Sequence, residues 1–369
     1  MLPVRPSSCG HVSSLLASAA LLCVSNPLAA QSFVHFESPH AHPLELTADG
    51  TRLLAVNTAD SRLEVFDVLA TAPYLRHAGS IGVGLDPVSV RARTSTEVWV
   101  VNHISDSVSI VDLSTMSVRA TILTGDEPCD VVFAGARQKA FVSVSQLNRI
   151  EVFNPTNLAA APSIIAIAGE DPRALATDGI TVYAAIAECG NDTTIVSELK
   201  VSSTVNPYAG DPNPPPNAGT GFSPPLAAGL PVSPKAGIIV RKDAAGAWKD
   251  INNVNWNAAV TWNLNGNDVA VINANSLAVS YAKGFMTTPT ALTMLPNGGV
   301  IAVGAEAKNE GRFEPNVKGV FVRSEVAILP AGGATVSAKG DLNPHLNYSV
   351  SSIPFMQRLL LLVTHAVSP

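Results

Sequence analysis

The sequence has few aromatic side chains and no clustered positive charge. Aromatic residues make up 5% of the 369-residue chain, and 23 Lys and Arg stand against 29 Asp and Glu, for a net charge of −6. The sequence has no run of Lys or Arg that could form a basic stripe and bind a phosphate backbone, so we expect no nucleic acid partner. At 47% hydrophobic and 14% charged, the chain is nevertheless expected to fold.

Long hydrophobic runs are also missing, apart from one near the N-terminus. Arg5 precedes the largely apolar stretch Leu15–Val24, and Asn26-Pro-Leu-Ala-Ala30 follows it. This order is typical of a secretory signal, so we predict a signal peptide over residues 1–30 and a mature chain from Gln31. No later stretch holds 18 consecutive apolar residues. We therefore expect no membrane span after processing, and a periplasmic or extracellular location.

Cysteine is scarce, and two of the four cysteines fall in the predicted signal. Cys23 follows Leu22 where a lipidation site requires a small residue, which favours ordinary cleavage over lipidation. Cys129 and Cys189 remain, much too far apart for a Cys-x-x-Cys metal or haem motif. They could form one disulfide after export, but two separate buried thiols are favoured.

The residues that are abundant favour an all-β fold with a repeat. Val, Ala, Thr and Ser are common, with 26 Gly and 27 Pro, which suits short strands and many turns. Similar segments open at five prolines, the first four about 40 to 45 residues apart: Pro43, Pro87, Pro128, Pro172 and Pro289. In the clearest unit, Glu97–Asn102 and Ser107–Asp112 are two of four short strands. This period is that of β-propeller blades, so we predict a propeller with five recognisable four-stranded blades over 31–349. A β-helix would need shorter coils, and a sandwich would not repeat its opening Pro.

The units resemble the YVTN family of propeller repeats. In that family a Val-Asn pair ends the second strand and an Asp ends the third, as at Asn57 with Asp67 and at Asn102 with Asp112. Recurrence in successive blades implies a structural role for these four residues.

The fourth unit is interrupted between about 201 and 266. Nine prolines lie between Pro207 and Pro234, so the first half is either a disordered excursion or part of a loop rim. Trp248, Trp256 and Trp262 hold three of the four tryptophans, which predicts local packing in the second half.

A more particular resemblance covers about Ser32 to Ser349. The segments Asn309–Pro315 and Asp341–Tyr348 are similar to those of large exported bacterial propeller proteins that continue into further blades and a Cys-x-x-Cys-His haem segment. This resemblance, together with the break in the strand pattern after Tyr348, implies a chain truncated from about seven blades, with an atypical tail over 350–369 of the kind that a shifted reading frame produces. Haem c would then belong only to a missing continuation, and we expect no cofactor in the chain itself. The strand-like Ser32–Ser38 is expected to complete the last blade.

Known catalytic and metal motifs are missing, so we predict no catalytic residue and no metal site. His40 and His42 could share a strand face but lack a third ligand. The carboxylates that could do acid–base work sit at turns, where Asp and Glu are common for structural reasons: Asp60, Asp106, Glu188 and Asp192.

These observations favour an exported binding or scaffold protein that presents a loop rim to an unidentified protein or small-molecule partner. The candidate ligand contacts are His103, Trp256, Trp262, Asn309, Glu310, Arg312, Glu314 and His345. Two alternatives stay open: the propeller part of a c-type cytochrome-like electron-transfer protein, and a lactonase-like hydrolase using His103 or Arg312.

Overall fold

The computed structural model describes residues 38–190, 192–201, 237–243, 245–250, 253–262, 265–312 and 318–347. The predicted signal, nearly all of the expected N-terminal strand, the Pro-rich stretch and the atypical tail lie outside these residues. No helix among the described residues is long and apolar enough to cross a membrane.

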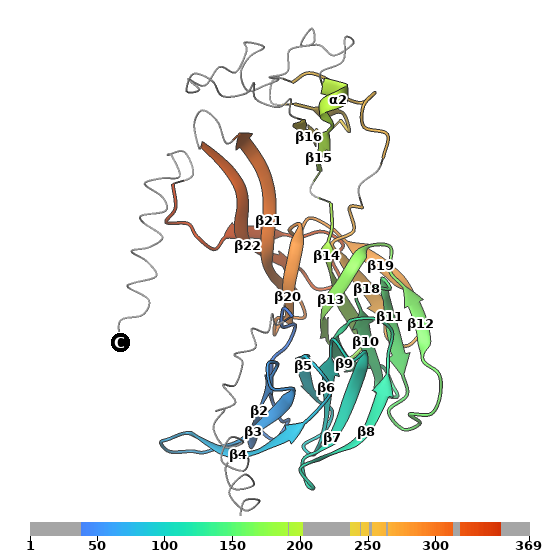
Figure 1. Cartoon of the computed structure of the whole chain (residues 1–369), viewed down its shortest axis with the longest axis vertical. Coiled ribbons are helices and arrows are strands. Elements are labelled where there is room, and N and C mark those ends of the chain that lie inside the picture. The colour runs from blue at the N-terminus through green and yellow to red at the C-terminus, as the bar shows by residue number, and fades with distance from the viewer. Residues whose placement is uncertain are drawn as a thin grey trace, which may run out of the picture. The chain divides into compact units, whose positions relative to one another are not determined.

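The described chain is almost entirely β and forms five four-stranded antiparallel sheets in a propeller-like arrangement (Figure 1). The first sheet contains β1 (Leu44–Leu46), β2 (Arg52–Asn57), β3 (Arg62–Val68) and β4 (Leu75–Gly82). The second contains β5 (Pro87–Ala92), β6 (Glu97–Asn102), β7 (Ser107–Asp112) and β8 (Ser117–Leu123). The third contains β9 (Pro128–Ala134), β10 (Lys139–Val144), β11 (Arg149–Phe153) and β12 (Ser163–Ala166). The all-β prediction and the five blades are confirmed.

The fourth sheet is interrupted by the insertion. It consists of β13 (Glu170–Thr177), β14 (Thr181–Glu188), β18 (Val269–Asn273) and β19 (Val279–Ala282). Strand β14 pairs directly with β18, with Ala185 opposite Val269. The excursion therefore leaves the sheet directly after Glu188, earlier than the sequence indicated.

The insertion forms a small unit of its own within the described residues. It consists of β15 (Thr193–Val196), the short helix α2 (Glu198–Val201), β16 (Ile238–Lys242) and β17 (Trp248–Lys249). Its three strands make a separate antiparallel sheet.

The fifth sheet carries a long hairpin. It contains β20 (Thr288–Met294), β21 (Val300–Arg312), β22 (Lys318–Leu329) and β23 (Ala338–Asp341). The paired part of β21 and β22 continues well beyond the length of β20 and β23.

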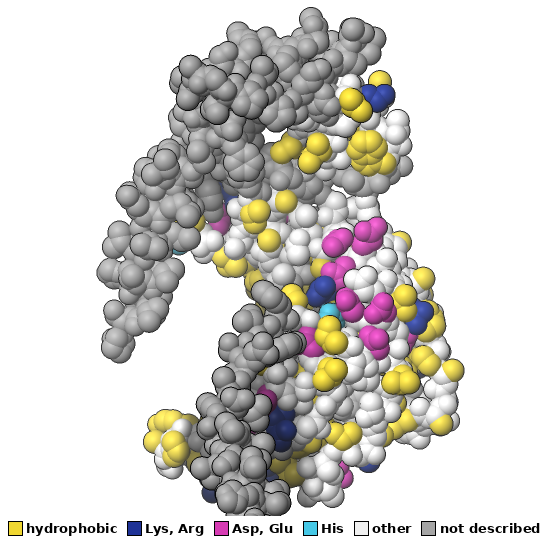
Figure 2. Space-filling view, viewed as in Figure 1, with side chains coloured by type: hydrophobic (Ala, Val, Ile, Leu, Met, Phe, Trp, Pro, Cys, Tyr) yellow, Lys and Arg dark blue, Asp and Glu magenta, His cyan; other side chains and the backbone are white. Residues whose placement is uncertain are grey.

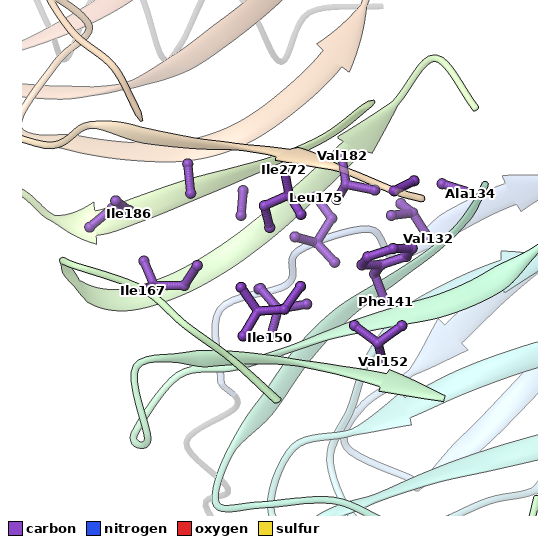
Figure 3. Close-up of a cluster of buried hydrophobic side chains, with 14 of the residues drawn as sticks. Val132, Ala134, Phe141, Ile150, Val152, Ile167, Leu175, Val182, Ile186 and Ile272 are labelled. Carbon is purple, nitrogen blue, oxygen red and sulfur yellow. The ribbon is translucent and has the colours of Figure 1, made fainter. Parts of the chain in front are cut away.

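Each pair of successive sheets encloses its own apolar core. Figure 3 shows the core between the third and fourth sheets, where Phe141 and Ile150 face Leu175 and Ile272. Separate clusters fill the junctions of the first with the second sheet, the second with the third, and the fourth with the fifth. A twisted sheet has two faces to cover, and stacking sheets side by side covers the inner faces in turn.

A buried ion pair adds a polar link between three sheets. Asp130 on β9 is fully buried, and one of its oxygens lies 2.9 Å from Arg91 Nη2 on β5. The same carboxylate accepts hydrogen bonds from Ser89 Oγ at 2.5 Å and from the backbone N–H of Leu175 on β13 at 2.9 Å. Burial alone would raise the pKa of Asp130, but the Arg91 charge and the hydrogen bonds from Arg91 and Ser89 hold that pKa below its ordinary value.

The strand order places particular loops at one end of all five sheets. In a four-stranded meander, the loop between the second and third strands and the link to the next sheet lie at the same end. We call this end the insertion face, because the insertion follows a second strand, β14. The tip of the β21–β22 hairpin also joins a second strand to a third, so it belongs to the same face.

Candidate functional site

Carboxylates concentrate on the insertion face. The acidic residues in its loops and strand ends are Asp60, Asp86, Asp106, Asp126, Glu127, Glu170, Asp171, Glu188 and Asp192. Over the same part of the chain, up to Asp192, the cations are Arg62, Arg149 and Arg173; further along, this side also carries Lys283 and, within the insertion, Arg241, Lys242 and Lys249. Figure 2 shows acidic side chains gathered on the viewed surface over the ends of β13 and β14 nearest the insertion. The four turn carboxylates that were considered for acid–base work all fall in this set.

Three of these carboxylates share one local motif, in which an acidic residue directly precedes the proline that opens the sheet. Asp86-Pro87, Glu127-Pro128 and Asp171-Pro172 open the second, third and fourth sheets. The acidic residue has a positive φ in each, 57°, 57° and 61°. Positive φ is uncommon for residues other than Gly, although Asn and Asp adopt it more readily than most, so it is least ordinary at Glu127. We call these three dipeptides the acid–proline corners.

His103 lies beside the second of these corners. It follows the end of β6 and is only 4% exposed. Its Nδ1 lies 3.0 Å from the carbonyl oxygen of Pro128, and its Nε2 lies 3.6 Å from a carboxylate oxygen of Glu127. His103 therefore lies on the insertion face but is buried there. A ligand would contact it only together with its neighbours Glu127 and Pro128.

Glu127 is the accessible member of this cluster. Its Oε2 accepts hydrogen bonds from Gln146 Nε2 at 3.1 Å and from Ser145 Oγ at 3.4 Å, and its side chain is 31% exposed. At the third corner, Asp171 Oδ2 accepts a hydrogen bond from Arg173 Nε at 2.6 Å, while its buried Oδ1 has no hydrogen-bond partner. Glu127 and Asp171 thus present partly satisfied carboxylates, whereas Asp86 at the first corner is buried.

The two cysteines are separate and buried, as the sequence favoured. Cys129 Sγ lies 3.8 Å from His103 Nδ1. Burial raises the pKa of the Cys129 thiol to about 12. A thiol with that pKa stays protonated at neutral pH, so this Cys–His contact does not supply a nucleophilic thiolate.

The Asn and Asp residues that recur at the strand ends of the repeat make contacts within their own sheets. Asn102 is fully buried and donates from Nδ2 to Ser109 Oγ at 3.0 Å. Asp112 accepts from the backbone N–H of Ser114 at 2.8 Å and so closes the turn after β7. Asp67 instead pairs with Arg52 at 3.0 Å and Arg76 at 2.7 Å. Asn57 ends β2 and is half-buried.

The insertion tryptophans divide into two kinds. Trp248 and Trp256 are buried in a small core with Val196, Ile238 and Val240, so the predicted local packing is present. Trp256 Nε1 donates to Asp250 Oδ2 at 2.8 Å. Trp262 is 43% exposed and donates to Thr194 Oγ1 at 3.2 Å, which leaves its ring accessible.

The remaining candidates lie apart from the corners. Asn309, Glu310 and Arg312 belong to the outer part of β21, so this polar segment is strand rather than loop, and Glu314 lies outside the described residues. His345 is exposed in a turn after β23. His103 follows a strand of the second sheet and His345 a strand of the fifth, so these two candidates stand on different sheets.

The histidine pair near the N-terminus contacts two different partners. His40 Nε2 lies 2.5 Å from Thr58 Oγ1, and His42 Nε2 lies 2.7 Å from Glu45 Oε2. Among the described residues, no group of three or more His, Cys, Asp or Glu is arranged to hold a metal ion.

Sequence reasoning missed the acid–proline corners, although their pattern is visible in the sequence. Leu85-Asp86-Pro87, Asp126-Glu127-Pro128 and Glu170-Asp171-Pro172 recur at the repeat period. The prolines mark the start of each repeat unit, and the acidic residue before each of them was assigned no role.

Comparison with known proteins identifies no family. No family model matches the sequence, and no curated protein matches it. Among solved structures, the chain resembles Kuenenia stuttgartiensis hydrazine synthase with a TM-score of 0.49 and 16% identity, covering 84% of this chain and 69% of that one. It also resembles U3-55K with a TM-score of 0.48 and 9% identity, covering 84% of this chain and 66% of that one.

Proposed function

We propose that this protein is an exported propeller scaffold of the YVTN kind that binds a cationic partner on its insertion face. The observation that carries the proposal is the set of acid–proline corners, which places Asp86, Glu127 and Asp171 at matching positions of three successive sheets. The repeated Val-Asn and Asp positions support the YVTN assignment, and the N-terminal signal pattern supports export.

The charge distribution favours a basic partner. Up to Asp192, carboxylates outnumber arginines in the insertion-face loops and strand ends, whereas the opposite loops of the described chain carry two charges of each sign, Asp49, Asp178, Arg93 and Arg137. A surface region of one charge sign attracts ligands of the other sign and speeds their association, in a salt-dependent way. Loops held by a rigid scaffold are the usual place for such recognition.

The test is titration of the purified protein with a hexalysine peptide at low salt. The double variant Glu127→Gln with Asp171→Asn removes two insertion-face charges, and Asn tolerates the positive φ at 171. We expect the dissociation constant to rise roughly threefold to tenfold, because exposed charges at contact distance contribute modestly in water.

The matched control removes two charges from the opposite loops. Asp49→Asn with Asp178→Asn changes the net charge equally and keeps side chains that can accept the same turn hydrogen bonds. This control should bind hexalysine as the unmodified protein does. Equal affinities for both double variants would contradict recognition by the insertion face.

A further inference from the structure

The first and fifth sheets each have one face that none of the four junction cores covers. In the first sheet, that face carries Leu44 and Leu46, which are 55% and 54% exposed, with Leu53, Ala55 and Phe66 beside them. Toward β4 the same face becomes polar, because Glu64 and Arg62 also lie on it, and Glu64 bonds His77 and Ser80 there. We call this set the first face. The opposite side of the same sheet is covered, since Leu54, Leu63 and Val65 are fully buried against the second sheet.

The fifth sheet shows the same asymmetry. Ile301 pairs with Ile328, and Val303 pairs with Val326, on the side turned away from the fourth sheet. These four residues, which we call the fifth face, are partly exposed and belong to none of the buried core clusters. On the other side, Val300, Ala302, Ala327 and Leu329 are buried against the fourth sheet.

The fifth face is also uncharged across its full width. One cross-strand row runs Thr293, Ile301, Ile328 and Ala338, and the next runs Ala291, Val303, Val326 and Gly340. The charged residues of these strands, including Glu306, Glu325 and Lys339, project on the other side, where they pair with one another. An apolar sheet face of this kind is built to pack against another sheet.

The chain itself shows what covers such faces. At each of its four junctions, the later face of one sheet packs against the earlier face of the next. The fifth face is a later face and the first face is an earlier one, so together they are the two halves of a fifth junction. None of the extensive strand contacts in the described part of the chain joins these two sheets to each other.

We infer that the fifth face of one copy packs against the first face of a second copy, head to tail. The second copy is the occupant because it carries the matching half of a junction that the chain already forms four times. Such a contact is heterologous, since the two copies contribute different surfaces. It buries apolar residues on both sides and leaves no charge of the fifth face unpaired.

The test is the mass of the purified protein at tens of micromolar, measured by sedimentation velocity. Leu46→Lys alters the first face at an exposed position. Val303→Lys alters the fifth face, and Ser324→Lys does so at an exposed position next to it. Leu123→Lys on β8, at a residue that is 78% exposed, is the control. Circular dichroism establishes that each variant is folded.

The unmodified protein and the Leu123→Lys control should associate, and each face variant alone should sediment as a single copy, with a dissociation constant raised roughly tenfold or more. An equimolar mixture of the Leu46→Lys and Ser324→Lys variants should restore a two-copy species, because each retains the face that the other lacks. A single-copy unmodified protein would overturn the inference. So would association that survives either face substitution, or a mixture that stays single.

Discussion

Asp130 shows how one side chain holds several sheets in place. It lies on β9, and its carboxylate accepts hydrogen bonds from the side chains of Ser89 and Arg91 on β5 and from the backbone N–H of Leu175 on β13. Arg91 in turn donates to the carbonyl oxygen of Leu175 at 2.9 Å. Every oxygen of this buried carboxylate therefore has a partner, which is the condition under which a buried charge is tolerated.

Replacing Asp130 with Ala should destabilise the fold by about 3–5 kcal/mol, because Arg91 would be left with a largely buried, uncompensated charge. Urea unfolding measures the change. Asp67→Ala is the control, since its partner Arg76 is 69% exposed and surface pairs contribute about 1 kcal/mol or less. Equal losses in the two variants would contradict a special role for Asp130.

The effect of Asp130 also depends on pH in a defined direction. Its folded-state pKa lies below the ordinary value of about 3.9, so its stabilising contribution is complete above that pH and is lost as the pH falls through the lowered folded pKa. The stability difference between the unmodified protein and Asp130→Ala should therefore be constant near neutral pH and shrink in strong acid.

Single residues are also where the sequence was least informative. The sequence shows that His103 directly follows the strand Glu97–Asn102, but its burial depends on Glu127 and Pro128 from the next sheet. Such contacts cross sheets, so a local pattern does not encode them.

Whole strands were predicted well, because the repeat supplies the same local signals several times. Glu97–Asn102 and Ser107–Asp112 are strands with the predicted bounds. The start of the insertion was less clear, since Thr193–Val196 has the composition of a third strand yet pairs with Ile238–Lys242 inside the insertion. Strand propensity alone does not identify the pairing partner.

The insertion has its own core, so it should be able to unfold while the five four-stranded sheets stay folded. Trp256 is 5% exposed, packs against the strands β15 and β16 and bonds Asp250. Trp256→Ala should remove about 3–5 kcal/mol from this core. Hydrogen exchange should show lost protection in β15–β17 while β9–β13 keep theirs.

Trp262→Ala is the matched control for that experiment. Trp262 is 43% exposed and lies outside the small core, so its loss should leave protection in β15–β17 nearly unchanged. If Trp256→Ala instead lowered protection equally in all five sheets, the insertion and the sheets would be one cooperative unit.

For the molecule as a whole, the period of the repeat was enough to predict the fold class. About 40 to 45 residues per unit, with four short strands each, leaves few alternatives to a propeller. The pattern predicted five units, and the described residues form five four-stranded sheets besides the three-stranded sheet of the insertion. The arrangement of charge on one face was not predicted, because it arises from which loops share an end, and that follows only from the strand order.

The proposed export makes a prediction for the whole molecule. When expressed with its own N-terminus in a bacterial host, the protein should be recovered from the periplasm with Gln31 as its first residue, as read by intact mass. Ala30→Lys should block this processing, because the cleavage site requires a small residue. Recovery from the cytoplasm with residues 1–30 still attached would contradict export.

The place where the insertion leaves the fourth sheet after β14 and rejoins it at β18 has a consequence for engineering. The insertion begins after β14 and ends before β18, and these two strands are hydrogen-bonded neighbours. Neighbouring strands lie about 4.8 Å apart, so the two ends of the insertion are close together. The entropy of closing a loop grows slowly, by about 0.6 kcal/mol for each doubling of its length. This position therefore serves as a graft site: a foreign module whose termini lie close together can replace the insertion while the register of the host strands is kept.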